Sequence, residues 1–211
     1  MPSTHSTTPP AATPFRLERL HALIRAFGAR RVAVVGDLIA DEFIYGEVAR
    51  VSREAPVLIL KYDATDVVAG GAGNAANNVA ALGGRVALAG MVGADAEGRR
   101  LLQAFRRGVV TRQVVRSRTY RTPVKTRILA GGVHSAKQQV VRIDRETDWP
   151  LSAEVSRAFA ERFVPALGDC DAVLLSDYGS GLVTPELAQA IREALSTSPT
   201  ARQVPIVVDT R

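Results

Sequence analysis

The sequence predicts an α/β fold with a central, mainly parallel sheet flanked by helices. Short apolar runs alternate with helical segments along most of the chain, which is typical of such a sheet. The apolar runs are those of buried strands, as in a sheet that helices cover on both faces. Hydrophobic residues make up 46% of the 211 residues and charged residues 23%, so the chain can form a core of ordinary composition.

The first elements follow from apolar spacing and from glycine. Apolar residues at helical spacing predict a helix over 15–27, which Gly28 can end. The run VAVVG predicts a buried strand over 31–36 that leads into a turn. A glycine-rich turn over 70–73 precedes a helix over 74–82 that is rich in Ala and Asn.

The later elements continue the alternation of strand and helix. Ser152 is expected to cap one helix, and Thr184 followed by Pro185 predicts the start of another, because Thr is a frequent N-cap and Pro fits the first helical position. The remaining predictions are strands over 86–89, 109–115, 172–175 and 205–208, and helices over 96–107, 152–167 and 184–195.

Two strand-rich stretches, about 43–68 and 122–144, do not fit this alternation. They predict a separate small sheet, such as a lid. Its expected strands are 43–45, 57–62, 124–129 and 138–143. The start of the chain, 1–14, is rich in Ser, Thr and Pro and is predicted to be a disordered tail.

Charge and composition narrow the classes of partner. Lys and Arg number 27 against 21 acids, a net charge of +6 that favours nucleic acid, anionic lipid or phosphorylated substrates. Aromatic residues are only 5%, no basic run is interleaved with them, and Arg99, Arg100, Arg106 and Arg107 read as solvated helix surface, so no nucleic-acid partner is expected.

Membrane and compartment follow from two further features. No apolar run approaches the roughly 20 residues of a membrane helix, so no membrane partner is expected. The single cysteine, Cys170, excludes an internal disulfide, which fits a cytoplasmic location. With no Cys or His partner near it in sequence, no metal site is predicted.

Two acids follow the first predicted strand, in the run Gly36-Asp37-Leu38-Ile39-Ala40-Asp41. Carboxylates at the carboxyl end of a strand can face a crevice and accept hydrogen bonds from sugar hydroxyls. A turn Asp and a helix-capping Asp would give the same spacing. The spacing leaves both interpretations open.

The glycine-rich run Gly70-Gly71-Ala72-Gly73-Asn74 leads into a helix. Glycine permits positive φ and a close approach of backbone to a ligand, and the helix N-terminus favours polar or anionic groups. Close helix–sheet packing through small residues explains the run equally well. The run is neither a Walker A loop nor a G-x-G-x-x-G fingerprint.

The segment 71–76 (GAGNAA), with Gly83 and Gly93 at their present spacings, resembles the first signature of PfkB carbohydrate kinases. It follows the G-D-x-x-x-D strand end and precedes 92–98 (VGADAEG), which is similar to the family's V-G-x-D-x-x-G turn. The resemblance implies a ribokinase-like fold with a small β-sheet lid. Within the family, the likeness is to the kinase domain of bifunctional ADP-heptose synthases, in stretches 36–46, 52–60, 120–144 and 174–183.

This resemblance implies a function. The expected activity is ATP-dependent phosphorylation of D-glycero-β-D-manno-heptose 7-phosphate at its anomeric hydroxyl, with Mg²⁺ accompanying ATP. The expected partner is therefore a sugar or sugar phosphate, and a homodimer formed through the lid is also implied.

The resemblance also implies binding residues. Asp41 and Asn74 are expected to hydrogen-bond sugar hydroxyls, and Gly70 and Gly71 to let the backbone approach the sugar. Asp177 is expected to face the sugar or the phosphate. In the resembling kinases a Lys often stands in the turn that follows it.

Three cations are candidates for holding a substrate phosphate. Lys125, Arg127 and Arg142 lie in the segments that approach the sugar from the lid in the heptose-phosphate kinases. Arg suits bidentate phosphate binding. Cross-strand charge pairing, for example of Arg142 with Asp144, is an alternative for all three.

The catalytic base of these kinases is an Asp in a second motif, G-A-G-D, which does not occur in this sequence. The resemblance therefore implies that the base and most of the ATP site lie beyond Arg211, and that 15–211 is a partial kinase domain, inactive alone. A non-catalytic sugar-phosphate-binding module, and a kinase for another sugar such as ribose or fructose, remain alternatives. The reading frame downstream of Arg211 distinguishes a non-catalytic module from a partial kinase. The three lid cations distinguish a kinase for a sugar phosphate from one for an unphosphorylated sugar, which would not need them.

Overall fold

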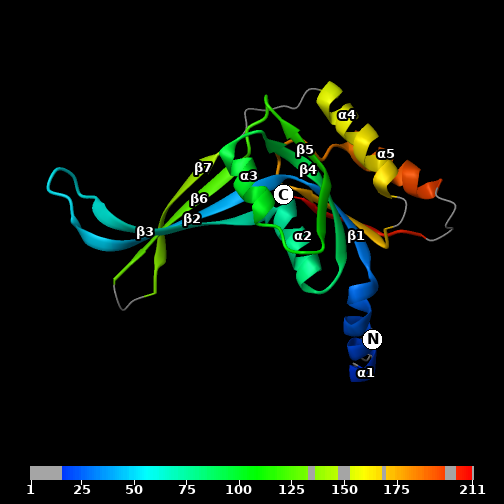
Figure 1. The fold of residues 1–211 in the computed structure, drawn as a ribbon, viewed down its shortest axis with the longest axis horizontal. Coiled ribbons are helices and arrows are strands. Elements are labelled where there is room, and N and C mark those ends of the chain that lie inside the picture. Colours follow the sequence, from blue (N-terminus) through cyan, green and yellow to red (C-terminus); the bar gives the residue numbers. More distant parts are fainter. Residues whose placement is uncertain (1–15, 133–135, 147–152, 168–169, 198–202, 211) are drawn as a thin grey trace, which may run out of the picture.

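The structure, a computed structural model, describes residues 16–132, 136–146, 153–167, 170–197 and 203–210. The predicted tail over 1–14 and the expected cap at Ser152 lie outside the described residues. The described chain forms a five-stranded sheet with helices on both faces and a second, four-stranded sheet that projects from it (Figure 1).

The helices and strands carry the labels used in Figure 1. They are α1 (Leu17–Ala26), η1 (Phe27–Ala29), β1 (Arg31–Gly36), β2 (Leu38–Val51), β3 (Leu58–Gly71), α2 (Ala72–Ala81), β4 (Arg85–Gly93), α3 (Ala96–Gln103), β5 (Val109–Ser117), β6 (Val124–Gly131), β7 (Gln138–Arg145), α4 (Ala153–Phe163), η2 (Val164–Leu167), β8 (Ala172–Asp177), α5 (Pro185–Ser196) and β9 (Ile206–Thr210).

The five-stranded sheet has the order β5-β4-β1-β8-β9, and every pair in it is parallel, as predicted. The chain runs outward from β1 through β4 to β5 and then crosses β1 to reach β8 and β9. The direction of winding therefore reverses between β1 and β8. In open α/β sheets ligands bind outside the carboxyl ends of the strands at such a reversal.

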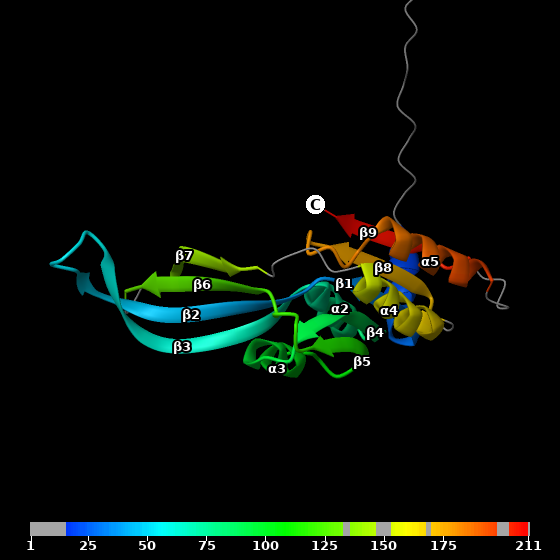
Figure 2. The same cartoon turned by 90° about the horizontal axis from the view of Figure 1, so that it is seen from above.

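Alternating side chains of β1 pack into two hydrophobic cores, one on each face of the sheet. Ala33 and Val35 pack into one core with Phe163 of α4 and Ile191 of α5. Val34 packs into the other, with α2, α3 and the first residues of β2. Figure 2 shows helices on both sides of the five-stranded sheet.

The second sheet has the order β3-β2-β6-β7, with β2 and β3 antiparallel, β2 and β6 parallel, and β6 and β7 antiparallel. β2 and β3 each have 14 residues, so the predicted strands 43–45 and 57–62 are far too short. Their polar residues and Gly46 mask the strand pattern in the sequence. β2 pairs with β3 on one side and with β6 on the other. A local sequence pattern does not reveal this pairing, which stabilises the strands.

Gly70 and Gly71 end β3, and α2 begins at Ala72, so the predicted turn over 70–73 is corrected. The amide of Ala72 donates to the carbonyl of Asp37 at 2.9 Å, which fixes the start of the helix. The predicted cap at Thr184 is confirmed, because its hydroxyl accepts from the amide of Leu187 at 3.2 Å.

α3 ends at Gln103, four residues before the predicted end. Asn77 of α2 explains this. Its amide group donates to the carbonyl of Ala104 at 3.1 Å and accepts from the amide of Arg106 at 2.9 Å. These bonds hold the chain in a turn after the helix.

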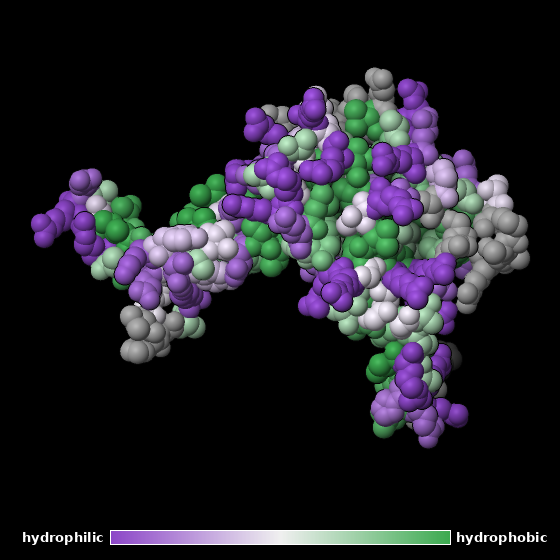
Figure 3. Space-filling view, viewed as in Figure 1, coloured by the Kyte–Doolittle hydropathy of each residue, from purple (hydrophilic) through white to green (hydrophobic). Residues whose placement is uncertain are grey.

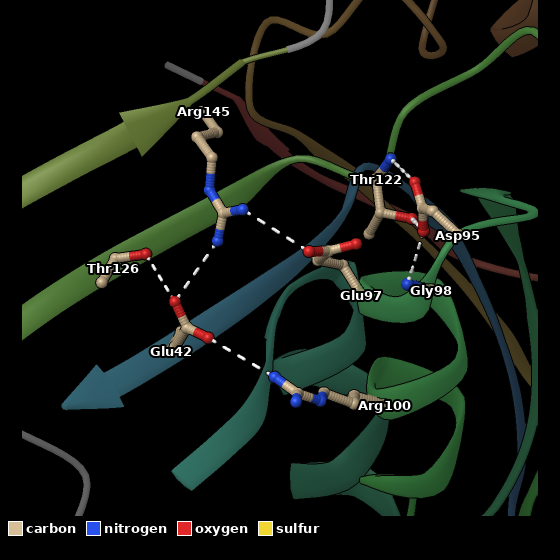
Figure 4. A network of polar contacts seen from close by, with 8 residues as sticks. All are labelled: Glu42, Asp95, Glu97, Gly98, Arg100, Thr122, Thr126 and Arg145. Carbon is tan, nitrogen blue, oxygen red and sulfur yellow. Dashed lines mark hydrogen bonds and ion pairs between the residues drawn. The ribbon is translucent and has the colours of Figure 1, made fainter. Parts of the chain in front are cut away.

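The start of α3 is tied to the segment before β6 (Figure 4). Asp95 is the N-cap, and its carboxylate accepts from the amides of Gly98 at 2.7 Å and Thr122 at 2.9 Å and from the hydroxyl of Thr122 at 2.7 Å. Burial acts to raise the pKa of Asp95, but the bonds from Thr122 and Gly98 outweigh it, so the pKa is lowered. The V-G-x-D-x-x-G turn thus anchors one end of the second sheet.

Asp95→Ala is expected to lower the free energy of unfolding by about 2 kcal/mol near neutral pH, because an N-cap and a side-chain hydrogen bond are both lost. A lowered pKa contributes stability above the unfolded value, about 3.9, that is lost as pH falls through the folded value. The difference between wild type and variant should therefore shrink below about pH 4. Urea unfolding at a series of pH values measures this.

Glu97→Ala is the matched control, because Glu97 lies in the first turn of the same helix and pairs with Arg145 at 3.5 Å on the surface. A surface pair contributes at most about 1 kcal/mol. A loss for Asp95→Ala no larger than that of the control would contradict the anchoring role.

Candidate functional site

The end of β1 is held to the end of β8 by Asp37, whose side chain is only 1% exposed. One carboxylate oxygen, Oδ2, accepts from the amides of Tyr178 at 2.8 Å and Ser180 at 3.1 Å. The backbone amide of Asp37 donates to the carbonyl of Ser176 at 3.1 Å. Asp37 is therefore a buried residue that joins β1 to the turn after β8 at the winding reversal, and it does not face a crevice.

The turn after β8 carries the half-buried Asp177. Its Oδ1 accepts from the amide of Gly179 at 2.9 Å, and its Oδ2 accepts from the hydroxyl of Thr210 at 3.0 Å. Gly179 has φ 82° and Gly181 has φ 78°, values that favour glycine. These bonds hold Asp177 at the carboxyl edge of the sheet.

One face of the second sheet, here called the inner face, is directed toward this turn. Strand register places Asp41 of β2 beside Lys125 of β6, and Lys125 beside Asp144 of β7. Residues two apart along a strand share a face, so Arg127 lies on the same side. The ammonium of Lys125 lies 5.8 Å from the ring centroid of Tyr178, which connects the inner face to the turn after β8.

Arg127 spans two groups of the inner face. Its guanidinium donates to Oδ1 of Asp41 at 2.6 Å, with both side chains about one-fifth exposed. The same guanidinium lies 5.3 Å from the ring centroid of Phe43. Asp41 is thus held in place by a cation before any ligand arrives.

Arg142 lies beside Arg127 across β6 and β7 and forms an ion pair with Asp144. Its Nε and Nη2 donate to the two carboxylate oxygens at 2.7 and 2.5 Å. This hydrogen bonding lowers the pKa of Asp144 and raises that of Arg142. The alternative of charge pairing therefore describes Arg142 and Arg127 as they stand in the structure.

Lys125 differs from these two cations. Within the described residues its ammonium lies over the ring of Tyr178, and no carboxylate lies within ion-pair distance of it. Its charge is therefore the most available of the three for an anionic group.

The predicted glycines lie against the two acids. A Cβ on Gly70 would lie 2.4 Å from the Asp41 carboxylate, and one on Gly71 would lie 2.3 Å from the carbonyl of Asp37. Asn74 is exposed in the first turn of α2. The glycines thus allow the β3–α2 junction to pack under Asp41, which is a structural reason for them beside any contact with a sugar.

The structure brings most of the predicted residues to one place. Asp41, Gly70 and the three cations lie together on the inner face, and Asp177 lies on the turn next to Lys125. Asn74 makes no side-chain hydrogen bond to any of them in the described structure. The predictions missed Tyr178, for which the run Asp177-Tyr178-Gly179 at a strand end was the available signal.

The opposite, outer face of the second sheet meets α3 through a separate network, shown in Figure 4. Glu42 accepts from the hydroxyl of Thr126 at 2.8 Å and pairs with Arg145 at 3.3 Å and with Arg100 at 3.7 Å. Arg100, predicted to be solvated helix surface, therefore also braces the sheet. This network connects the outer face of the second sheet to α3.

Two open hollows lie away from the inner face. One, of 540 Å³, lies beside Glu42 and Arg100, and the other, of 620 Å³, lies between the end of α5 and the start of β9. Neither is lined by the inner-face cations, Asp41 or Asp177. The site is therefore defined by its converging charges and by the winding reversal.

Two further observations concern metals and membranes. Among the described residues no group of three or more His, Cys, Asp or Glu side chains could hold a metal ion. In that same part of the chain, no helix has the length and apolar character needed to cross a membrane. Apolar side chains are nevertheless exposed on the projecting sheet, and green patches interrupt its surface in Figure 3.

Solved structures share this architecture. Ribokinase from Arabidopsis thaliana, complexed with ribose and ATP, matches 85% of this chain and 53% of its own, with a TM-score of 0.53 and 19% identity. Phosphofructokinase-2 from Escherichia coli, in complex with fructose-6-phosphate, matches 86% of this chain and 55% of its own, with a TM-score of 0.53 and 18% identity. The fold is therefore ribokinase-like.

The family follows from sequence. Residues 29–211 match the model of the pfkB family carbohydrate kinases, and the chain belongs to this family. The bifunctional protein HldE of Pelobacter propionicus is 42% identical over 177 residues, which are 83% of this chain and 34% of the relative. The HldE of Trichlorobacter lovleyi is 38% identical over 191 residues, 90% of this chain and 37% of the relative. The chain thus spans about a third of the length of these relatives.

Proposed function

We propose that this chain forms the sugar-binding part of an ATP-dependent kinase that phosphorylates D-glycero-β-D-manno-heptose 7-phosphate at the anomeric hydroxyl. The observation that carries the proposal is the gathering of Lys125, Arg127 and Arg142 around Asp41 on the inner face. Asp41 suits sugar hydroxyls, and the cations suit a phosphate on the same molecule. An unphosphorylated sugar would need no such cluster.

The residues of this chain would act by binding and orienting. Asp41 and Asn74 would accept or donate hydrogen bonds to the sugar, with the backbone of Gly70 and Gly71 close beneath it. Lys125 would hold the phosphate, and Arg127 would contact both Asp41 and the ligand. Phosphoryl transfer depends mainly on such positioning and on charge stabilisation.

In the proposed reaction the anomeric oxygen forms a bond to the γ-phosphorus of ATP as the bond from that phosphorus to the β-γ bridging oxygen breaks. ADP leaves, and the hydroxyl proton passes to a base. In resembling kinases this base is the Asp of a G-A-G-D motif, which these 211 residues lack. Mg²⁺ would accompany the nucleotide, as the family resemblance implies.

The activity is tested in the full-length gene product with ATP, Mg²⁺ and heptose 7-phosphate, followed by ³¹P NMR. A second sugar phosphate signal at the anomeric position should appear together with ADP. Faster turnover of ribose or fructose than of heptose 7-phosphate would contradict the proposed substrate. ADP release without a new sugar phosphate would contradict the proposed reaction.

Lys125→Ala is expected to weaken heptose 7-phosphate binding roughly 10- to 100-fold, because a hydrogen bond to a charged group contributes about 1.5–3 kcal/mol and each 1.4 kcal/mol is tenfold. Titration calorimetry with the 211-residue chain measures this. Binding of unphosphorylated heptose should change less than twofold, because only the phosphate contact is lost.

Lys61→Ala is the matched control, since Lys61 is an exposed lysine of the same sheet, paired with Glu47 in register on β3 and β2. It should bind as the wild type does. Equal losses for the two variants would indicate a diffuse charge effect and would contradict a phosphate site at Lys125.

A further inference from the structure

The carboxylate of Asp37 is buried in an unusual way. The side chain is 1% exposed, and its Oδ2 accepts two backbone amides, while Oδ1 is buried and has no hydrogen-bond partner within the described residues. No cation of the described chain pairs with it. Buried charges normally have a partner, so a group of this kind needs a reason.

The bonds of Asp37 join three elements at the winding reversal. Its side chain holds the amides of Tyr178 and Ser180 after β8, its carbonyl accepts the first amide of α2, and its own amide donates to β8. Two amides that converge on one anion define the backbone path of that turn. An acceptor at the position of Asp37 therefore stabilises this path of the turn.

The direction of Tyr178 follows from this path. Tyr178 contributes both the amide that Asp37 holds and the ring over which the ammonium of Lys125 lies at 5.8 Å. Asp177, the preceding residue, is held in turn by the amide of Gly179. One buried carboxylate thus sets the turn that meets the inner face.

We propose that Asp37 is a positioning residue that shapes the turn after β8. In this turn the ring of Tyr178 positions the ammonium of Lys125 toward the sugar phosphate, and the carboxylate of Asp177 faces the same ligand. Asp37 itself does not touch the ligand. This inference rests on the proposed function for the identity of the ligand, but its structural part, the hold on the two amides, does not.

The electrostatics agree with this role. Burial raises the pKa of Asp37, the amides of Ser180 and Tyr178 lower it, and the charge of Asp177 raises it, with a raised value as the result. The carboxylate is thus kept at an electrostatic cost, which Asn at this position would avoid. A charged acceptor binds amides more strongly than a neutral one. The role of Asp37 in holding the turn after β8 therefore explains why a carboxylate stands here.

The test compares Asp37→Asn with Asp95→Asn. Asp95 also accepts two backbone amides, but those of Gly98 and Thr122 rather than those of the turn after β8. Both variants should lower the melting temperature. Calorimetric titration with heptose 7-phosphate should show at least tenfold weaker binding for Asp37→Asn and less than a twofold change for Asp95→Asn.

Two outcomes would overturn the proposal. Unchanged affinity in Asp37→Asn would make Asp37 a purely structural residue, and equal losses in the two variants would indicate general destabilisation. If Asp37→Asn does not fold, amide hydrogen exchange in the wild type decides. Tyr178 and Ser180 should be strongly protected without ligand, and rapid exchange would overturn the inference. If the wild type binds no heptose 7-phosphate, the proposed function fails, whereas protected amides would still show the hold of Asp37 on the turn.

Discussion

Asp41→Asn is expected to weaken binding of heptose 7-phosphate by roughly 100-fold, because hydrogen bonds to a carboxylate contribute about 1.5–3 kcal/mol each and a sugar offers more than one hydroxyl. The substitution preserves shape but removes the charge that Arg127 holds at 2.6 Å. Titration calorimetry with the 211-residue chain measures the change.

The effect of Asp41→Asn should differ in kind from that of Lys125→Ala. Loss of Asp41 should weaken heptose and heptose 7-phosphate by similar factors, whereas loss of Lys125 should affect only the phosphorylated sugar. Glu47→Gln, a neutralised carboxylate further along β2, should leave both affinities unchanged. If Glu47→Gln weakened binding of the two sugars as much as Asp41→Asn does, Asp41 could not be assigned as a specific sugar-binding residue.

Gly71→Ala is expected to have the largest effect on stability. Gly71 has φ 56°, and a Cβ there would lie 2.3 Å from the backbone carbonyl of Asp37. With ψ at −135°, this positive φ is a sparsely populated conformation that costs Ala about 1–3 kcal/mol, and overpacking against a rigid backbone adds about 1–3 kcal/mol. The melting temperature should fall by on the order of 10 °C.

Gly179→Ala separates these two causes. Gly179 also has a positive φ, 82°, but nothing lies within 4 Å of a Cβ built there. Only the conformational cost applies, so its melting temperature should fall by less than half as much as that of Gly71→Ala. Thermal unfolding followed by circular dichroism measures both. Equal losses would show that the close approach of Gly71 to Asp37 contributes nothing.

Much of the central sheet could be predicted from sequence, because its signals are local. The run VAVVG, the Thr184-Pro185 helix start and the apolar strand 172–175 each depend on neighbouring residues. The lengths of β2 and β3 could not be predicted, because those strands are stabilised by pairing across the sheet rather than by their own pattern.

The site was predictable as a set of residues but not as a geometry. The motifs indicated Asp41 and the lid cations, yet the bond between Arg127 and Asp41 joins residues 86 apart in sequence and depends on the β2–β6 register. Asp37 shows the opposite limit. Its spacing from Asp41 suggested two acids at a crevice. Only the burial of its side chain shows that Asp37 holds the backbone rather than facing a ligand.

The most direct measurement of the central claim is calorimetric titration of this chain with heptose 7-phosphate and, in parallel, with heptose. The inner-face cations predict that the phosphorylated sugar binds at least tenfold more tightly, and that added salt weakens it, since exposed charges are screened. Equal affinity for the two sugars, or a phosphate preference that is undiminished in Lys125→Ala, would contradict the account.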